Sequence, residues 1–414
     1  MAFNLGLRAA EMRNFQGLLC SHHEVEIRLQ LMDLDHRSAG GEISARLVDG
    51  QVTFDATAAV SRALDMDLLD PNGALHLDSK SPDNGAMFAD RMIQVRYAVI
   101  NPLGTKRYTT PVFTGPLTKL ERNGMFVKVE AQGKEIFGLT RAWNEKTFKK
   151  GYRVTSAILF ILNRIMGENP RRIRIPNKRN KLPRNVSVGD DKLPWQVAKS
   201  LAASIGYHLF YDGEGICRMR RIPRSRVFTF HEGTNGSIKS QVDAGFSIDR
   251  VVNAVEVFGK KPKKEKGKTQ KKRPHARAVA PRNHPLSPWA LGRNGGPRYL
   301  PEVIEDDGIT SNKEARRRAN AELRSGLLES IDVAYDAVVI PYLEENDVVG
   351  CRTSKFSGNH RVQKFAIPLA AAGSMPVGYL RNVKPNASRI RVKQKRPTGR
   401  PNRRASVSRN RRRR

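Results

Sequence analysis

The sequence of 414 residues predicts an α+β protein with two β-barrel-like modules, α/β inserts and a disordered, basic C-terminal tail. Three observations predict this architecture. Apolar and polar residues alternate with period two through most of residues 1–140 and again after residue 330, which is typical of strands. Stripes of apolar residues at helical spacing lie between these regions. Lys and Arg are concentrated in a few short segments rather than spread along the chain.

Residues 1–140 predict the first β-rich, barrel-like module. Residues 24–31 alternate strictly, with four apolar side chains on one face. Asp49-Gly50 and Asn123-Gly124 each separate two alternating runs, and both pairs favour tight hairpin turns because their residues tolerate positive φ. We therefore expect short antiparallel strands joined by turns.

Residues 141–245 predict an α/β insert. One helix covers residues 157–165 and stops at Gly167, and a second begins at Pro194, a residue suited to the first helical turn. A hairpin over residues 207–222 follows the second helix. Residues 171–184, between the helices, are basic and run through Pro170, Pro176 and Pro183, so we expect an exposed loop there.

Residues 246–380 predict a second β module that includes a helix. Ser311 and the glutamate three residues later have the spacing of a capping box, and a stripe of apolar residues follows. Residues 331–339 and 361–369 alternate as strands do. Residues 260–301 contain seven Pro and four Gly among many Lys, so we expect a long basic loop without regular structure.

The charge of the chain lies mainly in three segments. Lys and Arg number 74 against 40 Asp and Glu, which gives a net charge of +34. Residues 381–414 hold 15 Lys and Arg and no acid, residues 260–282 hold 11 and one Glu, and residues 171–184 hold seven and no acid. The rest of the chain is nearly neutral. The tail lacks aromatic residues after Arg389, so we expect it to be disordered and to bind polyanions by counterion release.

These segments supply the candidate contacts to nucleic acid or to an acidic partner. The residues are Arg171, Arg172, Arg174, Lys260, Lys261, Lys263, Lys264, Lys271, Lys272, Arg273, Arg403, Arg404, Arg411, Arg412, Arg413 and Arg414. A solubilising or packing role for the tail is the alternative. The segments do not predict a base-specific reader, because such domains interleave their basic residues with base-reading groups on a folded face.

The sequence contains no motif that predicts catalysis. Phosphate-binding loops, dinucleotide-binding glycine motifs, nucleophile elbows and zinc-protease motifs are all missing from it. Cys20, His22 and His23 are close together, but strand alternation places the two histidines on opposite faces. We interpret the acids Asp33 and Asp35 as turn residues that accept hydrogen bonds from backbone amides. We therefore assign no catalytic residue, metal or cofactor.

Other features limit the class of protein. The acids at 305–307 precede the predicted third helix, where negative charge favours the helix dipole. The three cysteines are far apart, which excludes a disulfide scaffold. No apolar run approaches the length of about 20 residues that a membrane helix needs, and the charged N-terminus does not resemble a signal peptide. We expect a soluble protein of a reducing compartment, without membrane insertion.

Several short motifs, in this order along the chain, resemble one family. They are Asp49-Gly50-Gln51-Val52-Thr53 with Asp55-Ala56-Thr57-Ala58, Asp191-Lys192-Leu193-Pro194-Trp195, Phe210-Tyr211-Asp212-Gly213, Val251-Val252-Asn253-Ala254-Val255, Glu314-Ala315-Arg316-Arg317-Arg318-Ala319 and Leu343-Glu344-Glu345-Asn346-Asp347-Val348-Val349. Together they resemble the minor tail proteins of long-tailed bacteriophages, a group similar to the central hub of phage baseplates. The resemblance covers about residues 20–385 and leaves out the basic segments 260–282 and 381–414.

The resemblance implies a structural, non-enzymatic protein of the virion. Hub proteins of this kind form a homotrimer at the tail tip, where two barrel-like modules per chain give a pseudo-six-fold ring. The implied partners are other copies of the chain, the tail tube, distal tail proteins and the tape-measure protein, and the chain would be made in the bacterial host cytoplasm. Two alternatives stay open: a nucleic-acid-binding protein that uses the basic segments, and a tail-associated hydrolase with carboxylates distant in sequence.

Overall fold

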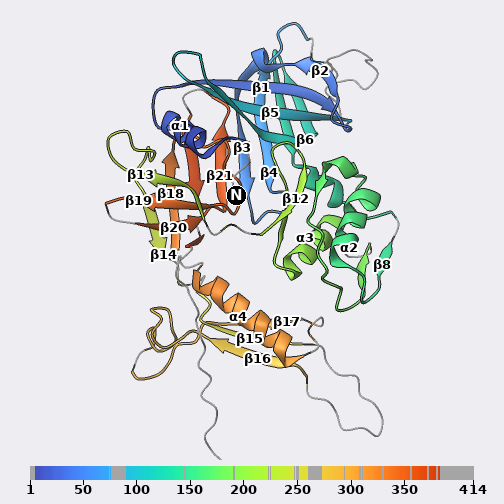
Figure 1. The fold of residues 1–414 in the computed structure, drawn as a ribbon, viewed down its shortest axis with the longest axis vertical. Coiled ribbons are helices and arrows are strands. Elements are labelled where there is room, and N and C mark those ends of the chain that lie inside the picture. Colours follow the sequence, from blue (N-terminus) through green and yellow to red (C-terminus); the bar gives the residue numbers. More distant parts are fainter. Residues whose placement is uncertain are drawn as a thin grey trace, which may run out of the picture.

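The computed structural model describes residues 5–382, apart from residues 74, 76–89, 144, 190–191, 222, 224, 247, 249–250, 260–272, 293, 307–308, 310, 329–330, 355–356, 371–372 and 379–380. The predicted disordered tail, from residue 383 onward, therefore lies outside the described residues. Figure 1 shows a large β-rich body, a helical insert beside it and a smaller unit of one helix on a sheet. None of the described helices is long and apolar enough to span a bilayer.

An open sheet of 11 strands forms most of the β-rich body, in the order β14-β18-β22-β21-β3-β4-β7-β6-β5-β1-β2. The expected barrel-like form of the two β modules stays a prediction: within the described part of the chain β14 and β2 end the strand order without pairing to each other, so this sheet does not close. The strands are β1 (Glu24–Asp33), β2 (Ser38–Glu42), β3 (Leu47–Asp55), β4 (Arg62–Leu69), β5 (Arg91–Ile100), β6 (Arg107–Asn123), β7 (Phe126–Gln132), β14 (Asp243–Phe246), β18 (Ile331–Ala337), β21 (Lys364–Pro368) and β22 (Met375–Gly378).

The turn at Asn123-Gly124 is confirmed, whereas the turn predicted at Asp49-Gly50 is wrong. β6 ends at Asn123, and Gly124 has a φ of +60°. Gly50 instead lies inside β3, where a β-carbon would come within 2.6 Å of the Met66 Cβ on β4. Glycine is needed there for the close approach of two strands, a requirement that the dipeptide alone does not distinguish from a turn.

Two further elements complete the β-rich body. Helix α1 (Ala9–Leu19) was not predicted; it buries Phe15 and Leu19, and the Phe15 ring stacks on Tyr108 at 4.5 Å between centroids. A four-stranded sheet has the order β13-β19-β20-β23 and contains β13 (Arg226–His231), β19 (Val348–Arg352), β20 (Ser357–Arg361) and β23 (Arg381–Asn382). One continuous hydrophobic core includes side chains from both ends of the chain, for example Val95 and Phe365.

The α/β insert has its own hydrophobic core, built around Trp195 and Ile158. Both predicted helices are confirmed, and Gly167 and Gly206 follow them with φ values of +74° and +79°. The elements are β8 (Lys146–Phe148), α2 (Val154–Phe160), a π-helical turn at Ile161–Ile165, a 3-10 turn at Pro170–Arg172, β9 (Ile173–Arg174), β10 (Val186–Val188), α3 (Pro194–Ser204), β11 (His208–Tyr211) and β12 (Cys217–Arg220).

The third unit packs α4 (Asn312–Leu328) across a sheet of three strands, β16-β15-β17 (Figure 1). The strands are β15 (Ala254–Phe258), β16 (His275–Val279) and β17 (Pro301–Glu305). The Ser311 hydroxyl caps α4 by accepting a hydrogen bond from the Glu314 amide at 3.2 Å, as predicted. The prediction of no regular structure over 260–301 is wrong at β16. This short strand lies between two prolines and pairs with β15, which is distant in sequence, so no local pattern marks it.

Candidate functional site

The structure places four of the basic candidate residues, and they belong to two different units. Arg171 and Arg172 lie in the 3-10 turn of the insert, and Arg174 follows on β9, which pairs in parallel with β12. The expected loop thus begins with ordered structure, and Ile173 between the arginines is buried. The candidates from Lys260 to Lys272 and from Arg403 to Arg414 lie outside the described residues.

Arg273 has a structural role in the third unit. Its Nε donates to the Gly259 carbonyl oxygen at 2.6 Å, and its Nη1 lies 3.2 Å from Glu305 Oε1. The guanidinium also lies 5.1 Å from the centre of the Phe258 ring. Arg273 therefore fixes the base of the segment 260–272, and its charge is largely used within the fold.

The other polar groups singled out in the sequence have ordinary structural roles. Asp33 Oδ1 accepts hydrogen bonds from the amides of Asp35 and Arg37, at 2.9 and 2.8 Å, which confirms the turn. His22 is exposed, and burial raises the pKa of the Cys20 thiol. Within the part of the chain that the structure describes, no three His, Cys, Asp or Glu residues form a group able to hold a metal ion.

Where the insert and the C-terminal strands meet β4, the structure contains a buried network of charges, here called the charged junction. It consists of Arg62, Asp212, Arg220, Glu344, Glu345 and Asp347. Arg62 Nη2 pairs with Glu344 and lies 3.5 Å from Glu345 Oε2, and all three side chains are at most 3% exposed. Arg220, on β12, lies 3.4 Å from Asp347 Oδ1 and donates to the Glu345 carbonyl oxygen.

The electrostatics of the charged junction are unusual because two neighbouring carboxylates differ. Burial raises the pKa of Glu344 to about 8, although Arg62 acts in the opposite direction. Burial also acts on Glu345, but the charges of Arg62 and of His208, whose Nε2 lies 3.7 Å from Glu345 Oε1, outweigh it and lower the pKa of Glu345 to about 2. Glu344 thus holds a proton more readily than Glu345. Because a protonated Glu344 carries no charge, Arg62 does not have to neutralise both acids.

A second set of contacts fixes the insert to the body. Lys134 Nζ lies 2.7 Å from Glu168 Oε2 and 3.0 Å from His36 Nε2, and the side chains of Lys134 and Glu168 are each 4% exposed. Gly213 packs against β6 so closely that a β-carbon would lie 2.0 Å from the Pro111 carbonyl oxygen. The Gly213 carbonyl oxygen accepts a hydrogen bond from Thr114 Oγ1 at 2.7 Å.

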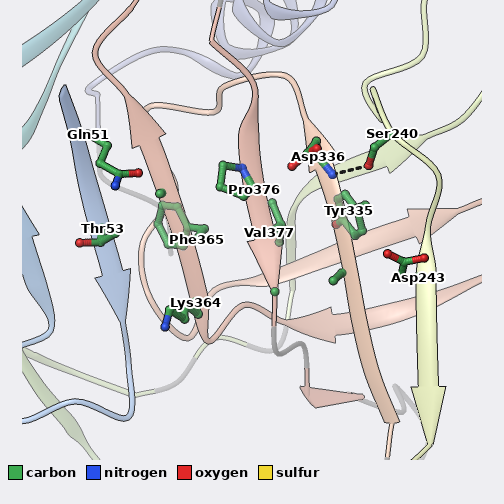
Figure 2. A pocket seen from close by; sticks show the side chains of 13 residues that line it. Gln51, Thr53, Ser240, Asp243, Tyr335, Asp336, Lys364, Phe365, Pro376 and Val377 are labelled. Carbon is green, nitrogen blue, oxygen red and sulfur yellow. Dashed lines mark hydrogen bonds between the residues drawn. The ribbon is translucent and has the colours of Figure 1, made fainter. Parts of the chain in front are cut away.

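Three of the surface grooves formed by the described residues have volumes above 300 Å³. The first, here called the sheet groove, has a volume of about 420 Å³ and crosses β3, β21, β22, β18 and β14. Figure 2 shows Asp243, Asp336 and Lys364 among its lining residues. The second, of about 320 Å³, lies beside α2, and the third, of about 540 Å³, lies between α1 and β13. No residue of the charged junction lines any of the three.

Sequence reasoning did not find the charged junction or the sheet groove. In the sequence, residues 343–349 are only one of the motifs that resemble the tail proteins, and nothing in them predicts buried charge. The burial of these acids is tolerated because Arg62, which is 282 positions from Glu344 in the sequence, supplies a positive charge beside them. No local pattern distinguishes these acids from those of an exposed turn.

The chain has the fold of known tail proteins. The 43 kDa tail protein of prophage MuSo2 from Shewanella oneidensis superposes with a TM-score of 0.59 at 15% identity, over 87% of this chain and 98% of that one. A tail protein from Neisseria meningitidis MC58 gives 0.57 at 10% identity, over 86% and 97%. Prophage tail protein gp18 from Listeria monocytogenes EGD-e gives 0.53 at 9% identity, over 86% and 95%. The resemblance to phage tail proteins is thus confirmed in the fold.

Sequence comparison gives no such match. No family model and no curated protein matches this chain. At identities of 9–15% the likeness is one of fold, carried by the arrangement of strands and insert rather than by shared side chains.

Proposed function

We propose that this protein is a structural component of a phage tail tip, a hub that connects the tail tube to distal tail proteins. The observation that carries the proposal is the fold shared with three tail proteins over almost their whole lengths, 95–98% of each chain. Because the match spans the β-rich body together with the insert, it concerns a whole architecture rather than one common module.

The internal contacts suit a connector that transmits force. Arg62 and Arg220 link β4 and the insert to the acids before β19. Breaking such buried pairs leaves charges without partners, so separation of the parts is costly. The outer strands of the sheets, β2, β14 and β13, have one edge that pairs with no other described strand. Exposed backbone edges of this kind can accept strands from a neighbouring chain.

The proposed assembly follows the resemblance in the sequence. We propose a homotrimer in which residues 1–140 and 246–380 of each chain act as two similar β modules around the tail axis. Its neighbours would be the tail tube, distal tail proteins and the tape-measure protein, and assembly would occur in the bacterial cytoplasm. We further propose that the protein is not an enzyme: Glu344 and Glu345, two buried carboxylates with shifted pKa values, contact Arg62 and line none of the three grooves.

Gold-labelled antibodies against the protein, imaged on intact particles from the source lysate, test the location. The hub proposal requires label at the end of the tail opposite the capsid. Label inside the capsid or on the host nucleoid, with bare tails, would contradict it and favour the nucleic-acid-binding alternative. Native mass spectrometry of the purified chain tests the trimer separately.

A further inference from the structure

We propose that the basic tail, residues 383–414, docks on the outer face of the long sheet of its own chain. This inference goes beyond the proposed function. It rests on the charge of the sheet face, on the groove within it and on the place where the described chain ends.

The outer face of β14, β18, β22, β21, β3, β4 and β7, with the end of β6, is acidic in a protein of net charge +34. Among the residues whose side chains the structure describes, strand registers place eight carboxylates and three lysines on this one face, which together carry a formal charge of −5. They are Asp49, Asp55, Asp65, Asp67, Glu121, Glu130, Asp243, Asp336, Lys119, Lys128 and Lys364.

Part of this negative charge is not used within the fold. Ion pairs join Lys364 to Asp55, Lys128 to Asp65, and Lys119 to both Glu121 and Glu130. By contrast, no ion pair within the described residues involves Asp49, Asp67, Asp243 or Asp336. The sheet groove opens between Asp243 and Asp336 on one side and Lys364 on the other (Figure 2). A cationic, extended segment therefore fits this face in charge and in shape.

The tail has the complementary charge and begins beside the face. Residues 383–414 carry 14 Lys and Arg and no acid. Gly378, at the end of β22, lines the sheet groove, and the described chain ends four residues later at Asn382. For comparison, a random-coil chain of 32 residues has a root-mean-square span of about 30 Å, and seven strands at about 4.8 Å cover a similar width. Tethering also gives the tail a local concentration on the order of millimolar, which favours docking within one chain.

Docking has a consequence for the tail's other partners. A polyanion must displace the sheet face before it binds the tail. Its apparent affinity for the tail is therefore the intrinsic affinity multiplied by the fraction of chains in which the tail is free. If the tail is docked for about nine-tenths of the time, the reduction is about tenfold. The face itself repels nucleic acid because both are negative.

Carbodiimide cross-linking of the full chain tests the proposal, since it joins amines and carboxylates in direct contact. An equal mixture of ¹⁴N and ¹⁵N chains separates links within a chain from links between chains. We expect Lys384, Lys393 and Lys395 to link within one chain, mainly to Asp49, Asp67, Asp243 and Asp336. The links should largely disappear in 1 M NaCl, where the screening length is about 3 Å.

Matched variants separate the face from general charge. The combined variant Asp67→Asn, Asp243→Asn and Asp336→Asn should lose the links at these three positions and keep only those to Asp49. It should also tighten the binding of a fluorescent oligonucleotide by up to about tenfold. The control removes three exposed acids elsewhere: Glu24→Gln, Asp35→Asn and Glu145→Gln.

Three results would overturn the proposal. Tail lysines that link to Glu24, Asp35 and Glu145 as often as to the face would show no docking site. Links found only between ¹⁴N and ¹⁵N chains would show that the tail does not occupy its own chain. An equal gain in oligonucleotide affinity in both variants would show that only net charge matters.

Discussion

Arg62 on β4 pairs with Glu344 in the turn before β19, although 282 positions separate them, and both side chains are 3% exposed. The guanidinium also contacts Glu345 and donates to the Val112 carbonyl oxygen at 3.1 Å. One buried cation therefore joins the N-terminal strands to the C-terminal strands. This contact adds to the pairing of β3 with β21, which joins distant parts of the sequence in one sheet.

Replacing Arg62 with Met should destabilise the fold strongly. The change leaves the ionised Glu345 buried without its cation and Glu344 without its partner, and breaking a buried pair in this way costs about 3–5 kcal/mol. Urea unfolding of the variant and the wild type measures this loss in the free energy of unfolding. Arg107→Ala is the control, because Arg107 and Glu26 are 34% and 36% exposed and such surface pairs contribute about 0–1 kcal/mol. Equal losses in the two variants would contradict a special role for the charged junction.

Gly213→Ala should loosen the insert from the body. The new β-carbon would lie 2.0 Å from the Pro111 carbonyl oxygen, and such overpacking costs about 1–3 kcal/mol. Limited proteolysis around residues 213–216, together with urea unfolding, measures the effect. In Gly17→Ala, where no heavy atom lies within 4 Å of the new carbon, helix α1 should gain about 0.5–1 kcal/mol instead. Unchanged proteolysis in Gly213→Ala would show that the close contact does not hold the insert.

Acid should destabilise the protein partly through His36. Burial, then the charges of Lys134 and Arg172, lower the pKa of His36 from 6.5 to about 3, while Asp33 opposes them. The unfolded chain therefore takes up a proton that the folded chain does not, and stability is lost as the pH falls from 6.5 towards 3. Between pH 6.5 and 5 the loss from this group is about 2 kcal/mol.

His36→Asn tests this pH dependence, since Asn tolerates the φ of 66° found at this position. Urea unfolding at pH 6.5 and pH 5 should show a smaller difference for the variant than for the wild type. His22→Asn, at an exposed histidine, should leave the difference unchanged. Parallel pH curves for His36→Asn and the wild type would rule out His36 as the cause.

Val95→Pro should abolish tail assembly if the hub proposal is correct. Val95 is fully buried on β5, between Leu29 of β1 and Phe113 of β6, and proline removes a backbone donor from the middle of the sheet. Complementation of a phage that lacks the gene, followed by electron microscopy of particles, gives the readout. Val95→Ala keeps the backbone donor and should still yield tails, at lower yield. Intact, infective tails with Val95→Pro would contradict an essential structural role.

Features that depend on neighbours in sequence were predicted well. The helix that starts at Pro194 and the cap at Ser311 are set by local conformational preferences, so each can be read from a few residues. The alternation in residues 24–31 predicted β1 for the same reason. Gly50 shows the limit of this reasoning, because a glycine in a turn and a glycine at a close contact between strands can have the same neighbouring residues in the sequence.

The sequence by itself determined the local elements and the segregation of charge, since periodicity, capping residues and composition act over a few positions. Only the tertiary structure decided which charges are used within the fold and which face outwards. Arg62 and Glu344 look like surface residues in the sequence, and Asp67, Asp243 and Asp336 belong to three separate strands. Burial and strand register bring such residues together across hundreds of positions, and these long-range contacts leave no local pattern to read.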